Sequence, residues 1–128
     1  MPRFVRDSQA PGPIVQAIGP RGFTVDGGIY PGLLLTPQRA DGWAPPALEA
    51  LGIEHLEAVL RLQPQPEFLL LGTGSEMRFA PRALVRALDE RGIGIEAMDS
   101  RAAARTWGML RGEERWIAAA IMPLSPGD

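Results

Sequence analysis

The stretch PEFLLLGTGSEMRFAPRALVRALDERGIGIEAMDS, residues 66–100, decides the predicted fold. Its continuous apolar run Phe68–Leu71 is bounded by a proline and a glycine, which is typical of a strand covered on both faces. Pro81 suits the first position of a helix, and Gly92 suits the position just past its end. A second strand over 93–98 completes a strand–helix–strand unit, which is right-handed in almost every known protein.

The sequence before this unit predicts short strands and one short helix. Residues 23–25 and 29–30 flank Asp-Gly-Gly, which indicates a hairpin, and 33–35 reads as another buried strand. Apolar residues at helical spacing predict an amphipathic helix over 54–62, with two prolines ending it. In the central helix, Leu84, Val85 and Leu88 form the expected buried stripe.

After residue 98 the pattern predicts one more helix and one more strand. Ser100 is placed to cap a helix over 101–110, and 116–122 reads as the last strand before a proline. We therefore expect a single-domain α/β fold with a mixed sheet, a β-rich N-terminal part and βαβ units in the C-terminal half.

Length and terminal composition suggest how the chain is divided. The 128 residues suffice for one domain that buries roughly 65–70% of the surface of its unfolded chain. Residues 1–13 are polar and proline-rich, so we expect a flexible N-terminal arm. The domain is expected over 14–124, with a short C-terminal tail over 125–128.

The composition excludes many kinds of site. The chain has no cysteine, no lysine and a single histidine, His55, which removes disulfides, thiolate and Schiff-base chemistry and histidine metal clusters. A net charge of −2 argues against nucleic acid as a partner. We predict no catalytic residue, no metal and no cofactor. The N-terminus lacks a signal-peptide core and no segment has the ~20 apolar residues of a membrane span, so we expect a cytoplasmic protein without direct membrane insertion.

One group of residues nevertheless forms a candidate ligand site. Parallel strands deliver their following loops to one edge of a sheet, where ligands collect in open α/β folds. The two strand ends here are GTGS and Met98-Asp-Ser, and the helix that follows adds a guanidinium and a hydroxyl. The residues predicted to contact an anionic or hydrogen-bonding ligand are Gly72, Thr73, Gly74, Ser75, Asp99, Arg105 and Thr106.

Each of these residues also has a purely structural interpretation. GTGS lacks the third glycine of a dinucleotide-binding motif and the lysine of a P-loop, so Gly72 and Gly74 could simply permit positive φ in a turn. Asp99 could be a carboxylate at a strand end or, together with Ser100, a helix cap. Arg105 could bind an anion or form a salt bridge with Glu76, Glu96 or Asp99.

Several blocks of the sequence resemble a small domain family of largely unknown function. The blocks are Leu69-Leu-Leu-Gly-Thr-Gly74, Phe79-Ala-Pro81, Gly92-Ile-Gly-Ile-Glu-Ala-Met-Asp99 and Ala103-Ala-Arg-Thr-Trp107, within a similarity that spans roughly 14–124. The family includes the mitochondrial assembly factor 3 of NADH:ubiquinone oxidoreductase and a vertebrate adipogenesis-associated protein. The resemblance implies a three-layer α/β domain with a central mixed sheet and carries over no catalytic residue.

The family's recurrent motif positions match this chain at six residues: Gly72, Thr73, Gly74, Met98, Asp99 and Thr106. The family commonly has an asparagine two residues after that threonine, where this chain has Gly108, so any contribution of that amide to a pocket is absent.

Two functions are compatible with these observations. The resemblance and the missing catalytic side chains favour a non-catalytic protein-interaction or assembly-factor-like domain, with a protein partner such as a membrane respiratory or secretion component. An apolar patch using Trp43 or Trp107 would serve such a contact. The alternative is a protein that binds a small anionic ligand, or a weak enzyme, using the loops at Gly72–Ser75 and Asp99.

Overall fold

The structure, a computed structural model, describes residues 12–124. The predicted tail and all but the last two residues of the predicted arm lie outside this range. The elements in chain order are β1 (Ala17–Gly19), β2 (Gly22–Val25), β3 (Gly28–Tyr30), β4 (Leu33–Leu35), β5 (Ala40–Gly42), the 3-10 helices η1 (Leu48–Ala50) and η2 (Ile53–His55), α1 (Glu57–Leu60), β6 (Phe68–Gly72), α2 (Arg82–Asp89), β7 (Gly94–Met98), α3 (Ser100–Gly112) and β8 (Ala118–Ile121).

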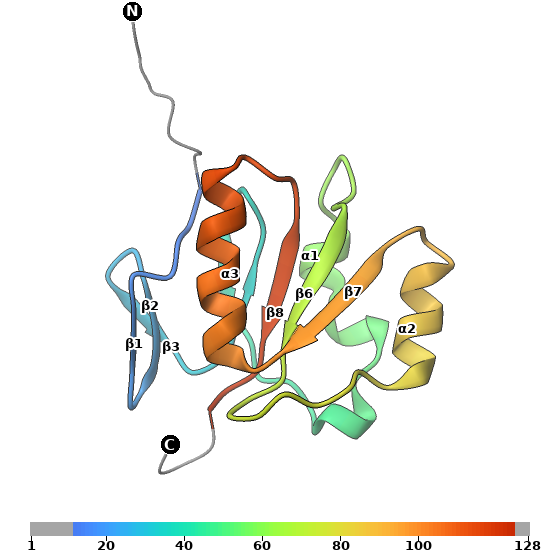
Figure 1. The fold of residues 1–128 in the computed structure, drawn as a ribbon, viewed down its shortest axis with the longest axis horizontal. Coiled ribbons are helices and arrows are strands. Elements are labelled where there is room, and N and C mark those ends of the chain that lie inside the picture. Colours follow the sequence, from blue (N-terminus) through green and yellow to red (C-terminus); the bar gives the residue numbers. More distant parts are fainter. Residues whose placement is uncertain (1–11, 125–128) are drawn as a thin grey trace, which may run out of the picture.

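The strands form two sheets, and the larger one is mixed as predicted. Its order is β5-β4-β8-β6-β7, with β6 parallel to both of its neighbours and β4 antiparallel to both of its own. The predicted hairpin is part of a separate antiparallel sheet, β1-β2-β3. Figure 1 shows α3 between the small sheet and strand β8 of the large sheet, with α2 beyond β7.

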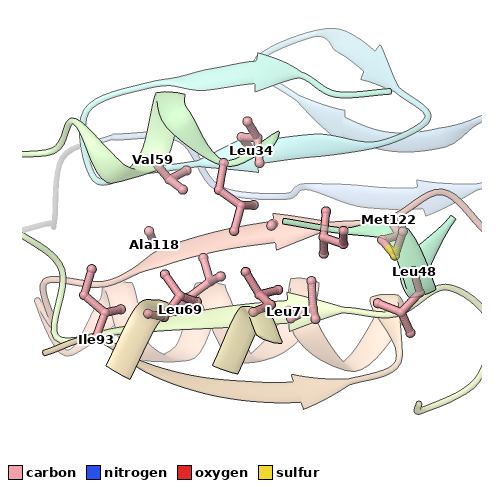
Figure 2. Close-up of a cluster of buried hydrophobic side chains, with 13 residues drawn as sticks. Leu34, Leu48, Val59, Leu69, Leu71, Ile93, Ala118 and Met122 are labelled. Carbon is pink, nitrogen blue, oxygen red and sulfur yellow. The ribbon is translucent and has the colours of Figure 1, made fainter. Parts of the chain in front are cut away.

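Successive side chains of a strand point to opposite faces of the sheet, so the core is divided between the two faces of the large sheet. Leu69 and Leu71 of β6 face one side, where they belong to the same buried cluster as Leu84 and Leu88 of α2; Figure 2 shows this cluster. Leu70 faces the opposite side, where the core includes α3 and strands of the small sheet. The result is the predicted three-layer domain, with β6 buried on both faces as its apolar run indicated.

The helix predicted over 54–62 is wrong in extent. The structure has the 3-10 turn η2, then the single-turn helix α1, separated by Leu56 with φ −117° and ψ 15°. His55 accounts for part of this break, because its Nδ1 accepts a hydrogen bond from the backbone N–H of Gly52 at 3.0 Å. Such a short segment forms no regular helix by itself, so tertiary packing determines its conformation.

The central helix also differs from its prediction in two details. Pro81 precedes α2 as its cap residue and does not occupy its first turn. Leu84 and Leu88 are buried as expected, but Val85 is 38% exposed, because only a narrow stripe of this helix contacts the sheet. Val85, at the side of this stripe, therefore remains at the surface.

Candidate functional site

The predicted site lies where β6 and β7 end side by side. The backbone N–H of Thr73 donates to the carbonyl of Met98 at 2.8 Å, and that of Ser100 donates to the carbonyl of Gly74 at 2.8 Å. These two bonds extend the parallel ladder beyond the last paired residues of the strands. The loops share one edge, as predicted, and these backbone groups are hydrogen-bonded to each other.

The hydroxyl of Ser100 connects this loop to the end of β8. Ser100 Oγ accepts a hydrogen bond from the N–H of Gly74 at 2.8 Å and donates to the carbonyl of Met122 at 2.7 Å. The residue is fully buried, so these bonds have no access to water. Ser100 was predicted to cap α3, which is wrong: it is the first helical residue, and its side chain connects three segments of the core.

Asp99 is the actual cap of α3. Its Oδ1 accepts a hydrogen bond from the N–H of Ala102 at 2.8 Å, in the geometry that stabilises a helix N-terminus. Of the two interpretations given for Asp99, the helix cap therefore describes its geometry.

The two glycines of the turn serve different purposes. Gly74 has φ +95°, a conformation that residues with a side chain rarely adopt, as the turn interpretation requires. Gly72 does not have a positive φ. A Cβ on Gly72 would lie 2.9 Å from both Cα and Oγ of Ser100, so its role is to admit the start of α3 close to the strand.

Thr73 fixes the conformation of the loop that follows. It is almost fully buried, and its Oγ1 accepts from the N–H of Arg78 at 3.0 Å while donating to the carbonyl of Glu76 at 2.6 Å. The polar groups of Thr73 are thus used within the chain, and the loop from Ser75 to Ala80 is held at its base.

A cleft of about 520 Å³ lies beside this loop, and we refer to it as the carboxyl-edge cleft. Its lining is rich in proline, and the residues are Pro45, Pro46, Ala47, Leu48, Glu49, Thr73, Gly74, Ser75, Glu76, Arg78, Met122 and Pro123. Three of the seven predicted site residues are among them. Arg78 forms an ion pair with Glu49 at this cleft. A hydrogen bond from the glutamate's own backbone, together with the Arg78 guanidinium, lowers the pKa of Glu49.

The remaining predicted residues lie elsewhere. Gly72, the last residue of β6, does not line this cleft, and neither do the helix-side residues Asp99, Arg105 and Thr106. Arg105 borders a separate hollow between α3 and β1 that also includes Ala17. Within the described part of the chain, Arg105 makes no ion pair with any of the three carboxylates considered for it. The structure therefore divides the candidate site into a cleft group and a helix group. Ligand binding by either group stays a prediction.

The most exposed apolar side chains near the cleft were not singled out by the sequence. Phe79 is 85% exposed and Met77 is 48% exposed, both in the loop held by Thr73. The sequence did contain a signal for an exposed aromatic side chain: Phe79 lies in a short predicted loop between the glycine turn and Pro81. The prediction that Trp107 contributes to an exposed apolar patch is wrong. Its side chain is fully buried, and its indole N–H donates to the carbonyl of Pro13 at 2.9 Å. Trp43 is half-buried against the core, with its indole N–H on the carbonyl of His55.

Residues 12–124 contain neither a metal-binding cluster nor a membrane-spanning helix. No group of three or more histidine or carboxylate side chains is arranged there to hold a metal ion. None of the helices in this range combines the length and apolar character that crossing a bilayer requires. The site as described offers hydrogen-bonded loops, one ion pair and apolar surface.

Comparison with known proteins identifies the family of the chain. Residues 15–122 match the family described as "Protein of unknown function (DUF498/DUF598)", and the chain belongs to that family. Over 117 residues it is 30% identical to the NADH dehydrogenase [ubiquinone] 1 alpha subcomplex assembly factor 3 of Danio rerio, which covers 91% of this chain and 67% of that protein. The chain spans 62% of the length of the Rattus norvegicus protein of the same name.

Bacterial proteins show the same similarity. An uncharacterised protein of Rhodobacter capsulatus is 31% identical over 88% of this chain and 86% of its own length. The solution structure of a Mth938-like domain from Bordetella pertussis superimposes with a TM-score of 0.75 at 25% identity, covering all of this chain and 94% of that one. The family resemblance and the α/β fold expected from the sequence are both confirmed.

Proposed function

We propose that the chain is a non-catalytic protein-interaction domain that acts in the cytoplasm as an assembly factor for a membrane-bound respiratory complex. The observation that carries this proposal is the similarity, over 91% of the chain, to a protein named as an assembly factor for NADH dehydrogenase. The chain spans only part of that protein, so the proposal concerns the shared domain.

The geometry of the candidate edge supports a binding role through surface contact. Thr73 and Ser100 make their hydrogen bonds within the chain, which leaves neither hydroxyl directed at a ligand. The exposed Phe79, in a loop held in place at its base, is the kind of aromatic side chain that anchors protein interfaces. These features favour a protein partner over the small-molecule alternative.

Deletion of the gene in the native organism tests the assembly role. We expect less fully assembled NADH dehydrogenase in native gel electrophoresis of membranes, with matching loss of NADH-dependent quinone reduction, and restoration by the wild-type gene. Succinate-dependent quinone reduction is the control, because a general loss of membrane quality would lower both. Unchanged assembly and activity after deletion would contradict the respiratory part of the proposal.

Affinity purification at native expression level tests the partner. The expected result is stable recovery of a subunit or a further assembly factor of the respiratory complex, identified by mass spectrometry and confirmed by reciprocal purification. Recovery of a secretion component instead would keep the interaction role and replace the respiratory assignment. Repeated purification of the chain alone under native conditions would count against an interaction domain of either kind.

A further inference from the structure

An apolar projection stands beside the carboxyl-edge cleft. It consists of Met77 and Phe79, and we refer to it as the apolar knob. The hydrogen bonds of Thr73 and the rigid ring of Pro81 fix the two ends of its loop, so its side chains are displayed with little conformational freedom to lose on binding. An aromatic ring that is 85% exposed on a fixed loop costs solvation free energy unless another surface covers it.

The cleft beside the knob is large enough to receive an aromatic side chain, with a volume of about 520 Å³. Its lining is mixed: Leu48, Met122 and three prolines alternate with polar and charged groups. The knob does not fill its own cleft, because neither Met77 nor Phe79 is part of the lining. Figure 1 shows the β6–α2 loop and η1 at the same end of the molecule.

Charged side chains of both signs flank the knob. Arg82 and Arg86 lie one turn apart on the exposed side of α2, directly after the knob, and neither is in an ion pair with another described residue. Glu76 directly precedes the knob in the same loop and also lines the cleft, where Glu49 is already paired with Arg78. The same edge therefore carries two arginines and one carboxylate that form no ion pair among the described residues.

We propose that two copies of this chain associate through this edge, with the apolar knob of each copy seated in the carboxyl-edge cleft of the other. A two-fold axis between knob and cleft makes both contacts at once, because such an interface uses the same patch on both partners. Arg82 and Arg86 of each copy then face Glu76 of the other. The complementary halves are both present on one chain, which favours a second copy over a foreign partner.

The expected association is modest in strength. Burying two phenylalanines removes about 300–500 Å² from water, against about 1,600 Å² in a standard interface, so the loop and α2 must supply the remainder. The inference does not require the proposed assembly role. Self-association could fail while the chain still acts as an assembly factor, and the experiment below measures the oligomeric state alone.

Sedimentation equilibrium of the full chain, from micromolar to millimolar concentration, tests the proposal. We expect a reversible monomer–dimer equilibrium that Phe79→Ser weakens about tenfold or more. Met109→Ser is the matched control, since it removes a side chain 61% exposed on α3, away from this edge. Both variants should keep the wild-type unfolding temperature, because neither side chain is part of the core.

A charge exchange tests the arrangement of the two copies. Arg82→Glu combined with Arg86→Glu in one preparation, and Glu76→Arg in another, should each weaken self-association by opposing like charges. An equal mixture of the two should recover it, because every contact in the mixed dimer pairs opposite charges. A wild-type chain that stays monomeric at millimolar concentration, a dimer indifferent to Phe79→Ser, or a mixture without recovery would each overturn the proposal.

Discussion

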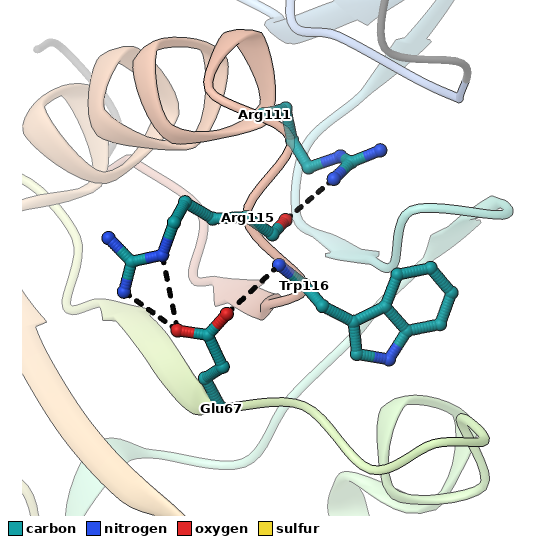
Figure 3. Close-up of polar contacts among 4 residues, drawn as sticks. All are labelled: Glu67, Arg111, Arg115 and Trp116. Carbon is teal, nitrogen blue, oxygen red and sulfur yellow. Dashed lines mark hydrogen bonds and ion pairs between the residues drawn. The ribbon is translucent and has the colours of Figure 1, made fainter.

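The two ends of the β6–β8 strand pair are joined by polar contacts of very different character. At the carboxyl end, the buried hydroxyl of Ser100 connects the loop after β6 to the residue after β8. At the amino end, Glu67 accepts hydrogen bonds from the Arg115 guanidinium at 2.7 and 3.1 Å, and from the N–H of Trp116 at 3.4 Å. Figure 3 shows this second contact, with Arg111 beside it on the carbonyl of Arg115.

Burial decides what each contact contributes. The side chains of Glu67 and Arg115 are 47% and 41% exposed, so water screens their attraction and replaces their bonds when they break. The Ser100 hydroxyl is fully buried, and no water is available to the two backbone groups it serves. One neutral hydroxyl should therefore stabilise the fold more than a well-formed ion pair, and the following variants test that expectation.

The largest effect is expected for Gly72→Ala at the carboxyl end. Its Cβ would lie 2.9 Å from Ser100 and 3.2 Å from Cβ of Ala103, so α3 must move away from the strand. We expect a loss of about 3 kcal/mol in the free energy of unfolding, measured by urea denaturation. The control is Gly108→Ala in the open interior of α3, which should stabilise by about 0.5–1 kcal/mol. Equal effects of the two variants would refute the close approach.

The next largest effect is expected for Ser100→Ala. Removing the hydroxyl leaves the N–H of Gly74 and the carbonyl of Met122 without these partners in a dry environment, at a cost of about 2 kcal/mol. Thr106→Ala, in the same helix, should change the free energy of unfolding by only a few tenths of a kcal/mol. If Ser100→Ala matched that control, the buried link would not be the stronger of the two.

A smaller effect is expected for the cap of α3. Asp99→Ala should lower the free energy of unfolding by about 1 kcal/mol, because the N–H of Ala102 loses its acceptor. Asp99→Asn should stay close to the wild type, since asparagine caps equally well. The same urea series measures both, and an asparagine variant as weak as alanine would show that the charge, and not the cap, is what matters.

The smallest effect is expected at the amino end, for Glu67→Gln. The Arg115 hydrogen bond lowers the pKa of Glu67, so its ionised form stabilises the fold above the ordinary pKa of a glutamate, and this is lost as the pH falls through the lowered value. The difference in unfolding temperature between wild type and variant should be near the error of the measurement at pH 7 and vanish in acid. A difference that grows as the pH falls would contradict this assignment.

The local pattern was sufficient for the fold but not for the details of the site. The apolar run at Phe68–Leu71 and the signals at Pro81 and Gly92 correctly predicted a strand covered on both faces, a helix and a parallel neighbouring strand. The sequence predicted Ser100 as a cap of this helix, alone or together with Asp99, because both residue types cap helices well, whereas in the structure Asp99 alone accepts the capping hydrogen bond. Only the position of β8 makes Ser100 a buried connection.

The sequence by itself determined the strand–helix–strand order from β6 to β8, the α/β class with a mixed sheet and the absence of whole classes of catalytic side chain. These follow from periodicity and composition, which act over a few neighbouring residues. The sequence did not predict β5 or the 3-10 helix η1. The tertiary structure alone decided that Thr73 and Ser100 use their hydroxyls internally, that Trp107 is buried and that Phe79 is exposed. Such outcomes depend on contacts between segments far apart in the chain, and no local pattern encodes which of several polar or aromatic residues will find a partner.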